Sequence, residues 1–493
     1  MLWRMAIALG ALLFMAPLAD AATGSAAVDT WYLRPTGACV NNGDGLAYGC
    51  AASAGATGAF IGRGNPIWTA TTGIDDGDTL YVCGEHTGGD VLFSSGAAAG
   101  TAAAPIIINF DCPDDAGIIK QVTTMTEALT PANWTNESGS LWYLSVASYS
   151  WKDPRRIWLN DVELFPSNSK ANLGTRVNSA TAPIGIFWYD SGNARIYLYS
   201  ATNPSTDLTS FQSLVAAGAG TYNAMRIPSD SADYITIINP RLEGGQLASL
   251  YILGGDNITV LGTNADDSTC NIGKNGVRGI FVSDANGNGT GNLSLDVTIQ
   301  DCTIDPVVPD QYRGSAWEYN WGFGDGISVS FGTTGTRVIS NTINGWPHSN
   351  YLIQAISGTT AVTDGYVADN TFTCTRNTAY CRGFGVDGAA AGRASNNWIV
   401  RNTFTGFPNR SQFNGNANYL VGNVFKDMRA DTVYSNRNEM LLFQPYGGYS
   451  DGNTVANNTF ENNAYAPCIG WMSDPGGTVQ NHIVINNILH NCG

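Results

Sequence analysis

Six short segments in the C-terminal half carry most of the side chains that could do chemistry. They are GDGISVSFG (324–332), HSNYLIQAIS (348–357), YCRGFGVDG (380–388), RSQFNGN (410–416), EMLLFQPYG (439–447) and CIGWMSD (468–474). Each mixes alternating apolar residues with Asp, His, Arg, Gln or Glu, although only 13% of the chain is charged. Because successive side chains of a strand point to opposite faces, the polar members are expected on one outward surface.

Acid, base and cation are all present on this predicted surface. The catalytic candidates are His348, Tyr380, Arg382, Arg410, Asp325 and Asp387. In a β-elimination, a base removes the proton beside a uronate carboxylate, and a cation stabilises the charge that develops. His348 or Tyr380 can act as base or acid, and Arg382 or Arg410 as the cation.

Hydrolysis of a glycosidic bond is the second reaction that fits, because two carboxylates flank the bond in such enzymes. Asp325 with Asp387 would serve, as would Glu318 or Glu439 with either of them. A third interpretation is a carbohydrate-binding or adhesion protein that does no chemistry.

Aromatic and amide side chains accompany the candidates and suit sugar binding. Aromatic faces stack on sugar rings, while amide and guanidinium groups hold hydroxyls. The predicted substrate-binding residues are Trp317, Glu318, Tyr319, Trp321, Gln354, Gln412, Glu439, Gln444 and Trp471.

Each candidate also has a purely structural interpretation. Asp325 in GDG can shape a turn, His348 can be a satisfied corner residue, and Arg382 can simply pair with Asp387. Trp317 and Trp321 can pack a loop onto the fold. The coincidence of these residues on one predicted surface is a stronger signal than any one of them.

A recurring phrase indicates how these segments are positioned. VISNTI, VADNTF, IVRNTF, LVGNVF, VANNTF and VINNIL place Asn341, Asn370, Asn402, Asn423, Asn458 and Asn487 after a short apolar run, at intervals of 29, 32, 21, 35 and 29 residues. Repeats of this length indicate a solenoid or a propeller. An interval of 21 residues is too short for a four-stranded propeller blade but long enough for one coil of a parallel β-helix.

Stacked coils explain the Asn itself. Its side chain carries both donors and an acceptor, so a column of inward-pointing Asn residues at a corner can satisfy itself. Asn also tolerates the left-handed backbone that such corners need, so we expect the Asn to adopt it. In VTIQDCTI (297–304) Cys302 takes the Asn position, and in YITIINPRL (234–242) Pro240 does. These Asn residues are therefore predicted to be structural.

Composition and cysteine content point to export. Arg4, the apolar run MAIALGALLFMAPL and Ala19-Asp20-Ala21 resemble a cleavable signal peptide over residues 1–21; an uncleaved anchor is the alternative. The ten cysteines form close neighbours, Cys39/Cys50, Cys83/Cys112, Cys270/Cys302, Cys374/Cys381 and Cys468/Cys492, and five local disulfides are predicted. A net charge of −16 argues against nucleic acid as partner.

The N-terminal part resembles a known group of proteins. WYLRPTGACVNNGDGLAYG (31–49), IDDGDTLYVCGEH (74–86) and AAAGTAAAPIIINF (97–110) resemble the opening of secreted right-handed parallel β-helix proteins, among them polysaccharide lyases of the chondroitinase B and alginate lyase type and some glycoside hydrolases. The resemblance implies a cap followed by the first coils. The Lys-Ser catalytic pair of the chondroitinase B-like lyases is not matched after LVGNVF, so no catalytic residue is carried over.

The sequence therefore predicts an all-β, right-handed parallel β-helix with an N-terminal cap. The expected organisation is a signal peptide (1–21), cap and first coils (22–112), a β-rich excursion (113–230) and the main coils (231–493). The predicted function is a secreted or periplasmic, monomeric enzyme on an extracellular polysaccharide, foremost a uronate lyase. No membrane span is expected after signal cleavage. No cofactor is assigned; calcium is left open, and metal ligands are unknown.

Overall fold

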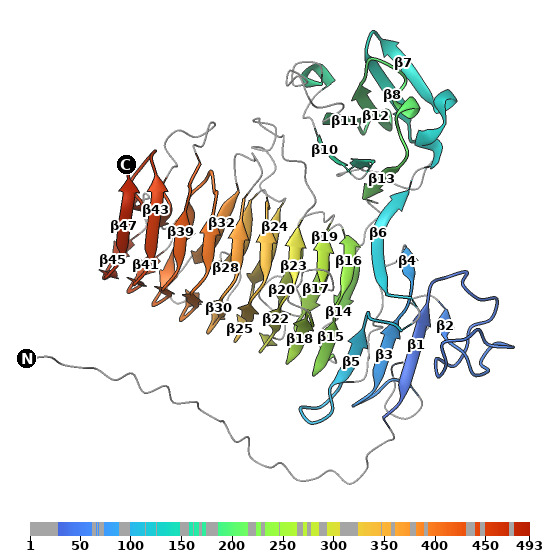
Figure 1. Cartoon of the computed structure of the whole chain (residues 1–493), viewed down its shortest axis with the longest axis horizontal. Helices are drawn as coiled ribbons and strands as arrows, with labels where there is room; N and C mark the ends of the chain where they lie inside the picture. Colours follow the sequence, from blue (N-terminus) through green and yellow to red (C-terminus); the bar gives the residue numbers. More distant parts are fainter. Residues whose placement is uncertain are drawn as a thin grey trace, which may run out of the picture.

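Successive turns of the chain stack into an elongated rod in the computed structural model (Figure 1). The structure describes residues 28–61, 66, 68, 73–87, 99–113, 115–124, 126–147, 157–160, 162–166, 170–173, 186–214, 223–227, 232–245, 247–263, 270–273, 278–284, 293–305, 324–346, 348–355, 360–374, 381–388, 393–429, 439–443, 449–472 and 478–493. The predicted signal peptide, Tyr380, Gln444 and the aromatic insertion with Trp317, Glu318, Tyr319 and Trp321 lie outside these residues.

Four parallel sheets form the sides of the rod. Sheet 1 has 13 strands, in the order β2 (Phe60–Ile61), β1 (Thr30–Arg34), β3 (Thr79–Val82), β5 (Ile106–Asn109), β15 (Ile235–Ile238), β18 (Ile258–Leu261), β22 (Thr298–Gln300), β26 (Arg337–Ile339), β30 (Tyr366–Ala368), β34 (Trp398–Val400), β38 (Tyr419–Val421), β42 (Thr454–Ala456) and β46 (Ile483–Ile485). Sheet 2 contains β4 (Glu85–Thr87), β6 (Ile118–Thr124), β16 (Arg241–Gly244), β19 (Asn271–Gly273), β23 (Thr303–Asp305), β27 (Thr342–Asn344), β31 (Thr371–Thr373), β35 (Thr403–Thr405), β39 (Val424–Lys426), β43 (Thr459–Asn463) and β47 (Ile488–Cys492).

The other two sheets complete each turn. Sheet 3 contains β14 (Met225–Ile227), β17 (Ala248–Leu253), β20 (Arg278–Ser283), β24 (Asp325–Ser330), β28 (Ser349–Ala355), β32 (Arg382–Gly388), β36 (Ser411–Phe413), β40 (Leu441–Phe443) and β44 (Ile469–Trp471). Sheet 4 contains β21 (Ser294–Leu295), β25 (Thr333–Thr334), β29 (Val362–Thr363), β33 (Ala394–Ser395), β37 (Gly415–Asn416), β41 (Tyr449–Asp451) and β45 (Thr478–Gln480). One turn therefore runs through sheets 3, 4, 1 and 2, and the predicted parallel β-helix is confirmed.

Inward-pointing side chains stack into columns that form the core. On sheet 2, the rings of Phe372, Phe404, Phe425 and Phe460 lie face to face, with centroids 4.8, 4.5 and 4.8 Å apart. All four are almost completely buried. Burying one such side chain is worth about 1.5–3 kcal/mol, so each added turn extends a continuous apolar core.

The predicted asparagine ladder is present at the corner between sheets 1 and 2. Asn341, Asn370, Asn402, Asn423, Asn458 and Asn487 form one column, in which each Nδ2 donates to the Oδ1 of the next Asn at 2.9–3.0 Å. The same Oδ1 atoms accept the backbone N–H of the preceding Asn. The ladder thus satisfies polar groups that the corner would otherwise bury without partners.

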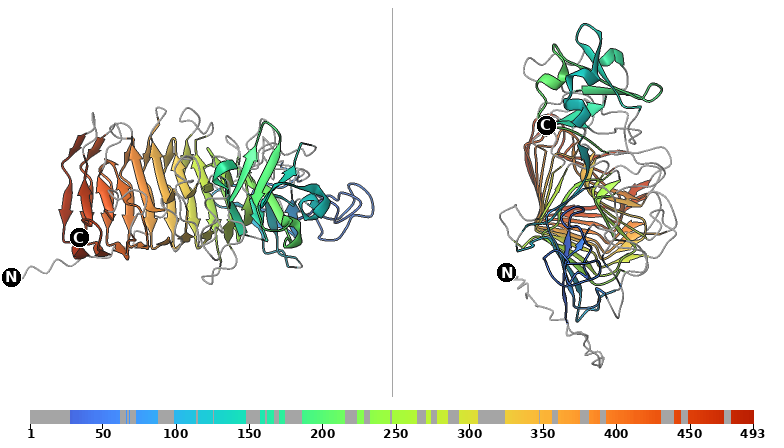
Figure 2. Two further views of the ribbon diagram at one scale, coloured as in Figure 1. Left: turned by 90° about the horizontal axis from the view of Figure 1, so that it is seen from above. Right: turned by 90° about the vertical axis from the view of Figure 1, so that its right-hand side faces the viewer.

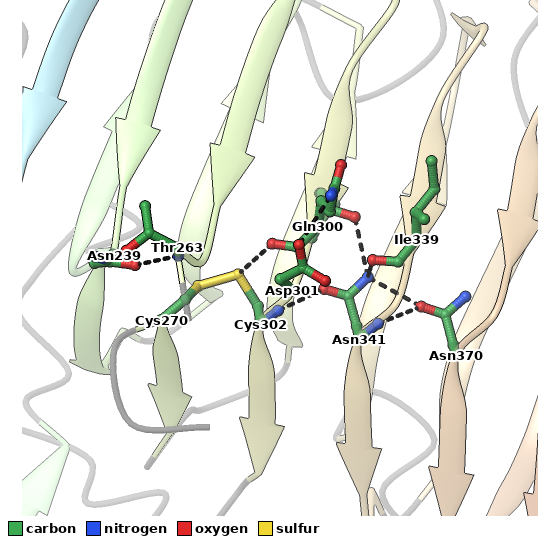
Figure 3. The surroundings of a disulfide bond; sticks show 10 residues. Asn239, Thr263, Cys270, Gln300, Asp301, Cys302, Ile339, Asn341 and Asn370 are labelled. Atoms are coloured by element: carbon green, nitrogen blue, oxygen red, sulfur yellow. Dashed lines mark hydrogen bonds between the residues drawn. A yellow bond between two sulfur atoms is a disulfide. The ribbon is translucent and has the colours of Figure 1, made fainter. Parts of the chain in front are cut away.

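Cys302 continues this column, as predicted, and a disulfide replaces the next amide contact. The Cys302 N–H donates to Asn341 Oδ1 at 3.0 Å, and its sulfur is bonded to Cys270 (Figure 3). All five predicted cysteine pairs form disulfides.

The expected backbone conformation of the ladder Asn residues is wrong. The positive φ angle falls one residue earlier, at Ser340, Asp369, Arg401, Gly422, Asn457 and Asn486. The corner is turned by the residue before the Asn, and the Asn is left free to point inward. Five of these six residues are not glycine, and two of them, Ser340 and Arg401, are neither Asn nor Asp. The left-handed conformation costs about 1–2 kcal/mol per non-glycine residue.

A second ladder, which the sequence analysis missed, lies at the corner between sheets 4 and 1. Asn397 Nδ2 donates to Asn418 Oδ1 at 3.0 Å, and the Asn418 N–H donates to Asn453 Oδ1 at 2.8 Å. The Asn453 N–H then donates to Nδ1 of His482 at 3.2 Å. Each member stands five residues before a member of the first ladder, so a repeated Asn-x4-Asn spacing was the available signal.

An antiparallel, β-rich excursion interrupts the coils, as predicted, and stands off to one side of the rod (Figure 2). Its predicted bounds, 113–230, also enclose β6 and β14, which belong to sheets 2 and 3 of the rod. It contains β7 (Trp134–Ser138), β8 (Leu141–Ser145), β9 (Ile157–Leu159), β10 (Val162–Pro166), β11 (Ile186–Asp190), β12 (Arg195–Tyr199) and β13 (Phe211–Leu214), with short 3-10 turns at Thr126–Leu129, Pro131–Asn133, Lys170–Asn172 and Pro204–Thr206. Its core, around Trp134, Phe187 and Phe211, is a cluster distinct from that of the rod. Strand β6 links the two, because it pairs in parallel with β16 and antiparallel with β13. Within the described residues, no helix is long and apolar enough to span a membrane.

Candidate functional site

The six polar segments stack on one another along sheet 3, as the sequence analysis expected. Strands β24, β28, β32, β36, β40 and β44 are consecutive neighbours in this sheet. Ile327, Tyr351 and Phe384 are in register and buried in the core. The residues that directly follow them, Ser328, Leu352 and Gly385, form the next row and face outward.

Three X-Gly dipeptides place charged side chains at the starts of β20, β24 and β32, with β28 between the last two. Arg278 is in register with Asp325, and Ser349 pairs with both Asp325 and Arg382. A Cβ on Gly326 would meet Ile343 and the Trp346 ring, so this position points into the core and leaves Asp325 on the outside. Gly383 likewise points at the Phe404 ring, inside the rod.

Asp325 and His348 form the central contact of this site. His348 Nδ1 lies 2.8 Å from Asp325 Oδ1, and Arg278 Nε lies 3.7 Å from Asp325 Oδ2. The Asp325 side chain is 7% exposed and that of His348 is 18% exposed. A carboxylate on Nδ1 holds the proton there and leaves Nε2 with its lone pair, which is the arrangement of a general base.

Asp387 belongs to the same electrostatic environment. Desolvation raises the pKa of this half-buried carboxyl above its usual value, and Asp325 adds to the rise. The charges of Arg382 and His348 and a hydrogen bond from Asn414 partly oppose it. A carboxyl whose pKa is raised in this way holds its proton to higher pH, which suits a general acid.

Arg382 is the cation placed deepest in the site. Its side chain is 3% exposed, and Nη1 donates to Gln412 Oε1 at 2.6 Å. Its Nε and the hydroxyl of Ser349 are both buried without a hydrogen-bond partner. Buried donors are normally paired, so two open donors beside Asp325 and His348 suit an anionic ligand group.

Arg410 and Glu439 lie one and two strands further along. Arg410 precedes β36 and Glu439 precedes β40, and Arg410 Nη1 lies 3.6 Å from Glu439 Oε2. Gln354 is in register with Asp387 on the outward row. The structure therefore brings Asp325, His348, Arg382, Asp387 and Gln412 together and places the Arg410–Glu439 pair beyond them.

Trp471 departs from the predicted surface. It is in register with the buried Phe443, and their rings stack at 5.5 Å. It therefore continues an inner column, and its 55% exposure reflects its position on the last strand of sheet 3. Tyr380, Gln444 and the insertion with Trp317, Glu318, Tyr319 and Trp321 are outside the described residues.

Arg278 and Ser349 are site residues that the sequence analysis missed. The signal for Arg278 was the dipeptide Arg278-Gly279, which repeats the pattern of Asp325-Gly326 and Arg382-Gly383. Its guanidinium lies over the Phe281 ring at 4.2 Å, and this ring stacks on Tyr251 at 4.9 Å. Burial raises the pKa of Tyr251 to about 12, so its hydroxyl stays protonated.

Side chains that could ligate a metal are not clustered in the part of the chain that the structure describes. The described residues contain no cluster of three or more His, Cys, Asp or Glu side chains that could hold a metal ion. The prediction that left calcium open stays untested.

Comparisons with known proteins define the class by its fold. No protein-family model matches the chain, and no curated protein matches it. A solved structure described as a glycoside hydrolase superposes with a TM-score of 0.52 at 10% identity, covering 94% of this chain and 97% of that one. The chain is thus a parallel β-helix protein.

Two further solved structures align over most of the chain. The surface adhesin PfbA of Streptococcus pneumoniae aligns with a TM-score of 0.43 at 11% identity, covering 85% of this chain and 79% of that one. An alginate lyase from Paenibacillus sp. str. FPU-7 aligns with a TM-score of 0.35 at 9% identity, covering 85% and 92%.

Proposed function

We propose that this protein is an exported enzyme that cleaves a uronate-containing polysaccharide by β-elimination. The observation that carries the proposal is the 2.8 Å contact between His348 Nδ1 and Asp325, beside the buried Arg382. His348 is the base and Arg382 the charge stabiliser, and both lie along sheet 3. The five disulfides are consistent with an oxidising compartment outside the cytoplasm.

The proposed reaction uses four groups in defined roles. His348 Nε2 takes the proton from the carbon beside the uronate carboxyl, and Arg382 stabilises the negative charge that develops on that carboxyl. A double bond forms as the bond to the leaving oxygen breaks. Protonated Asp387 supplies the proton that this oxygen needs, and Asp325 holds the imidazolium that results.

Hydrolysis is the second candidate, favoured by the raised pKa of Asp387. Two carboxyls in different environments suit an acid and a base, and Asp325, facing the guanidinium of Arg278, is the carboxyl placed beside a permanent cation. In that reaction Asp387 protonates the glycosidic oxygen and Asp325 activates water.

The products distinguish the candidates. A panel of uronate polysaccharides is incubated with the protein, with calcium and with a chelator. β-Elimination gives an unsaturated product that absorbs in the ultraviolet, whereas hydrolysis gives reducing ends without that absorbance. Retardation of a polymer in a gel without either product would indicate a binding protein and overturn both enzymatic proposals.

A further inference from the structure

The outer face of sheet 1 carries a strip of apolar side chains over four consecutive strands, β26, β30, β34 and β38. The middle residues of these strands are in register and fully buried: Val338, Val367, Ile399 and Leu420. The residues on either side of them therefore point outward. We define the sheet 1 strip by six of these outward residues, Tyr366, Trp398, Tyr419, Ile339, Val400 and Val421.

The same four coils show that the apolar strip is particular to sheet 1. On sheet 2, the outward residues that follow the buried middle residue are polar: Asn344, Thr373, Thr405 and Lys426. The corresponding residues on sheet 1 are Ile339, Ala368, Val400 and Val421. Strands favour β-branched residues for their shape, and Thr meets that preference with a hydroxyl in place of a methyl group. Strand propensity therefore does not account for the apolar strip.

Trp398 is the most exposed residue of the strip and is held in a fixed position. Its ring stacks on that of Tyr419, with centroids 4.0 Å apart and planes 14° apart. The contact covers one face of the indole, and Trp398 is still 40% exposed. A rigid aromatic side chain offers a large contact area and loses little conformational entropy on binding. The apolar C–H surface of sugar rings is a matching partner for such a side chain and for the aliphatic residues beside it.

Exposed, planar polar side chains border the strip on both sides. At the corner with sheet 4, the Asn396 amide donates to the Asp364 carboxylate. At the corner with sheet 2, Arg401 donates to both oxygens of Asp369, at 2.8 and 2.6 Å. Each carboxylate retains lone pairs beyond these bonds, so it can accept hydrogen bonds from sugar hydroxyls.

We propose that the sheet 1 strip binds a linear, neutral β-1,4-linked polysaccharide, whose flat sugar rings lie on the apolar residues while their hydroxyls reach the polar border. This binding surface is separate from the candidate site on sheet 3 and does not depend on the proposed reaction. The formal charges of Arg337 and Arg401 cancel those of Asp364 and Asp369 around the strip. A polyanion therefore finds no attraction here, in contrast to the arginines of the candidate site.

The size of the strip argues against a second copy of the chain as the occupant. Four strands about 4.8 Å apart, each with three residues of about 3.3 Å, give a footprint of about 200 Å². A stable protein–protein interface buries about 800 Å² on each partner. A single polysaccharide chain is narrow enough for the strip and needs no wider surface.

Affinity electrophoresis of the full chain, in gels that contain hydroxyethylcellulose, xylan or glucomannan, tests the proposal. Trp398→Ala removes the exposed indole, and Val400→Asp places a charge within the strip. The matched controls are Tyr465→Ala, an exposed aromatic residue outside sheet 1, and Thr405→Asp, an outward residue of the same coil on sheet 2. We expect at least one polymer to retard the native protein and both controls equally, with a dissociation constant at least tenfold weaker in both strip variants.

No retardation by any of the three polymers, or native affinity in both strip variants, would overturn the inference. His348→Gln is expected to bind the neutral polymer like the native protein, and loss of binding in this variant would place the polymer in the candidate site instead. A native dimer that dissociates in Val400→Asp, measured by sedimentation velocity, would show that a second copy covers the strip and would also contradict the proposal. Failure to cleave any uronate polymer contradicts only the proposed enzyme, because binding to the strip is measured without cleavage.

Discussion

At the scale of single residues, the Asp325–His348 contact makes a specific prediction about tautomers. In Asp325→Asn the amide can donate to Nδ1, which moves the imidazole proton to Nε2 and removes the lone pair that acts as base. We expect Asp325→Asn and His348→Gln each to lower kcat by about 10²–10⁴-fold while polymer binding is retained. Steady-state kinetics and gel retardation measure the two effects, and native turnover in either variant would place the base elsewhere.

Replacing Asp387 by Asn is expected to raise the stability of the protein and to lower its activity. Burial raises its pKa in the folded state above the usual value of 3.8, so the folded protein binds more protons than the unfolded chain between these two values. The contribution of this carboxyl to the free energy of unfolding is largest below pH 3.8. It decreases as pH rises through the pKa that the group has in the folded state. The neutral Asp387→Asn variant should therefore melt at a higher temperature than the native protein at pH 7.

Turnover and melting temperature of Asp387→Asn, measured together, distinguish a general acid from a carboxyl that is only structural. We expect kcat to fall by about 10²-fold or more, because Asn has no proton to give. Melting curves at pH 3.5 should show that the stability difference has vanished. A variant with unchanged turnover across the pH range would leave Asp387 without a role in proton transfer.

At the scale of elements, the asparagine ladder is expected to contribute more in the middle of the rod than at its end. Asn402 donates to Val367 O and Val400 O, and its Oδ1 accepts from Asn370. Asn402→Ala leaves several of these groups buried and unpaired, at about 1–3 kcal/mol each, so we expect a loss of about 3 kcal/mol or more. Asn487→Ala, on the last coil, should cost less, and denaturant unfolding of both variants checks the order.

His482 gives the second ladder a dependence on pH. Burial lowers its pKa from 6.5, with Asp451 among the groups that oppose the shift, and its Nδ1 accepts the Asn453 N–H, which a protonated ring cannot do. The unfolded chain therefore binds more protons just below pH 6.5, and stability falls as pH drops from there through the folded pKa. His482→Asn keeps a carbonyl acceptor and should flatten the change in melting temperature between pH 7.5 and 5. An equal slope in both proteins would contradict this assignment.

The elements were predictable from sequence to the extent that they repeat. The Asn phrase predicts the ladder, and the spacing of the polar segments predicts their stacking on sheet 3, because coils in register bring distant segments together. The local turn chemistry was not predictable in the same way. The left-handed position is occupied by Ser340, Asp369 and Arg401, which share no side-chain type, so only the stacked backbone determines it.

The candidate site was predictable as a surface but not as a set of contacts. Outward alternation places Gln412 and Asp387 correctly, whereas the pairing of His348 with Asp325 depends on side-chain reach between neighbouring strands. Trp471 was assigned to the wrong side of the sheet. Side chains alternate along CIGWMSD, but the sequence does not reveal which of the two alternating sets points into the core. Only its register with Phe443 decides that question.

At the scale of the whole molecule, the rod and the excursion are expected to unfold as separate units. Each has its own apolar core, and residues 113–230 contain no cysteine, so all five disulfides lie outside the excursion. Loss of a disulfide typically costs about 2–5 kcal/mol. Reduction should therefore lower the melting temperature of the rod and leave that of the excursion unchanged. Hydrogen-exchange mass spectrometry, with and without reductant, follows peptides over Trp134–Ser145 for the excursion and Arg337–Thr373 for the rod. Loss of protection in both sets at one temperature would show a single cooperative unit, with β6 coupling the two cores.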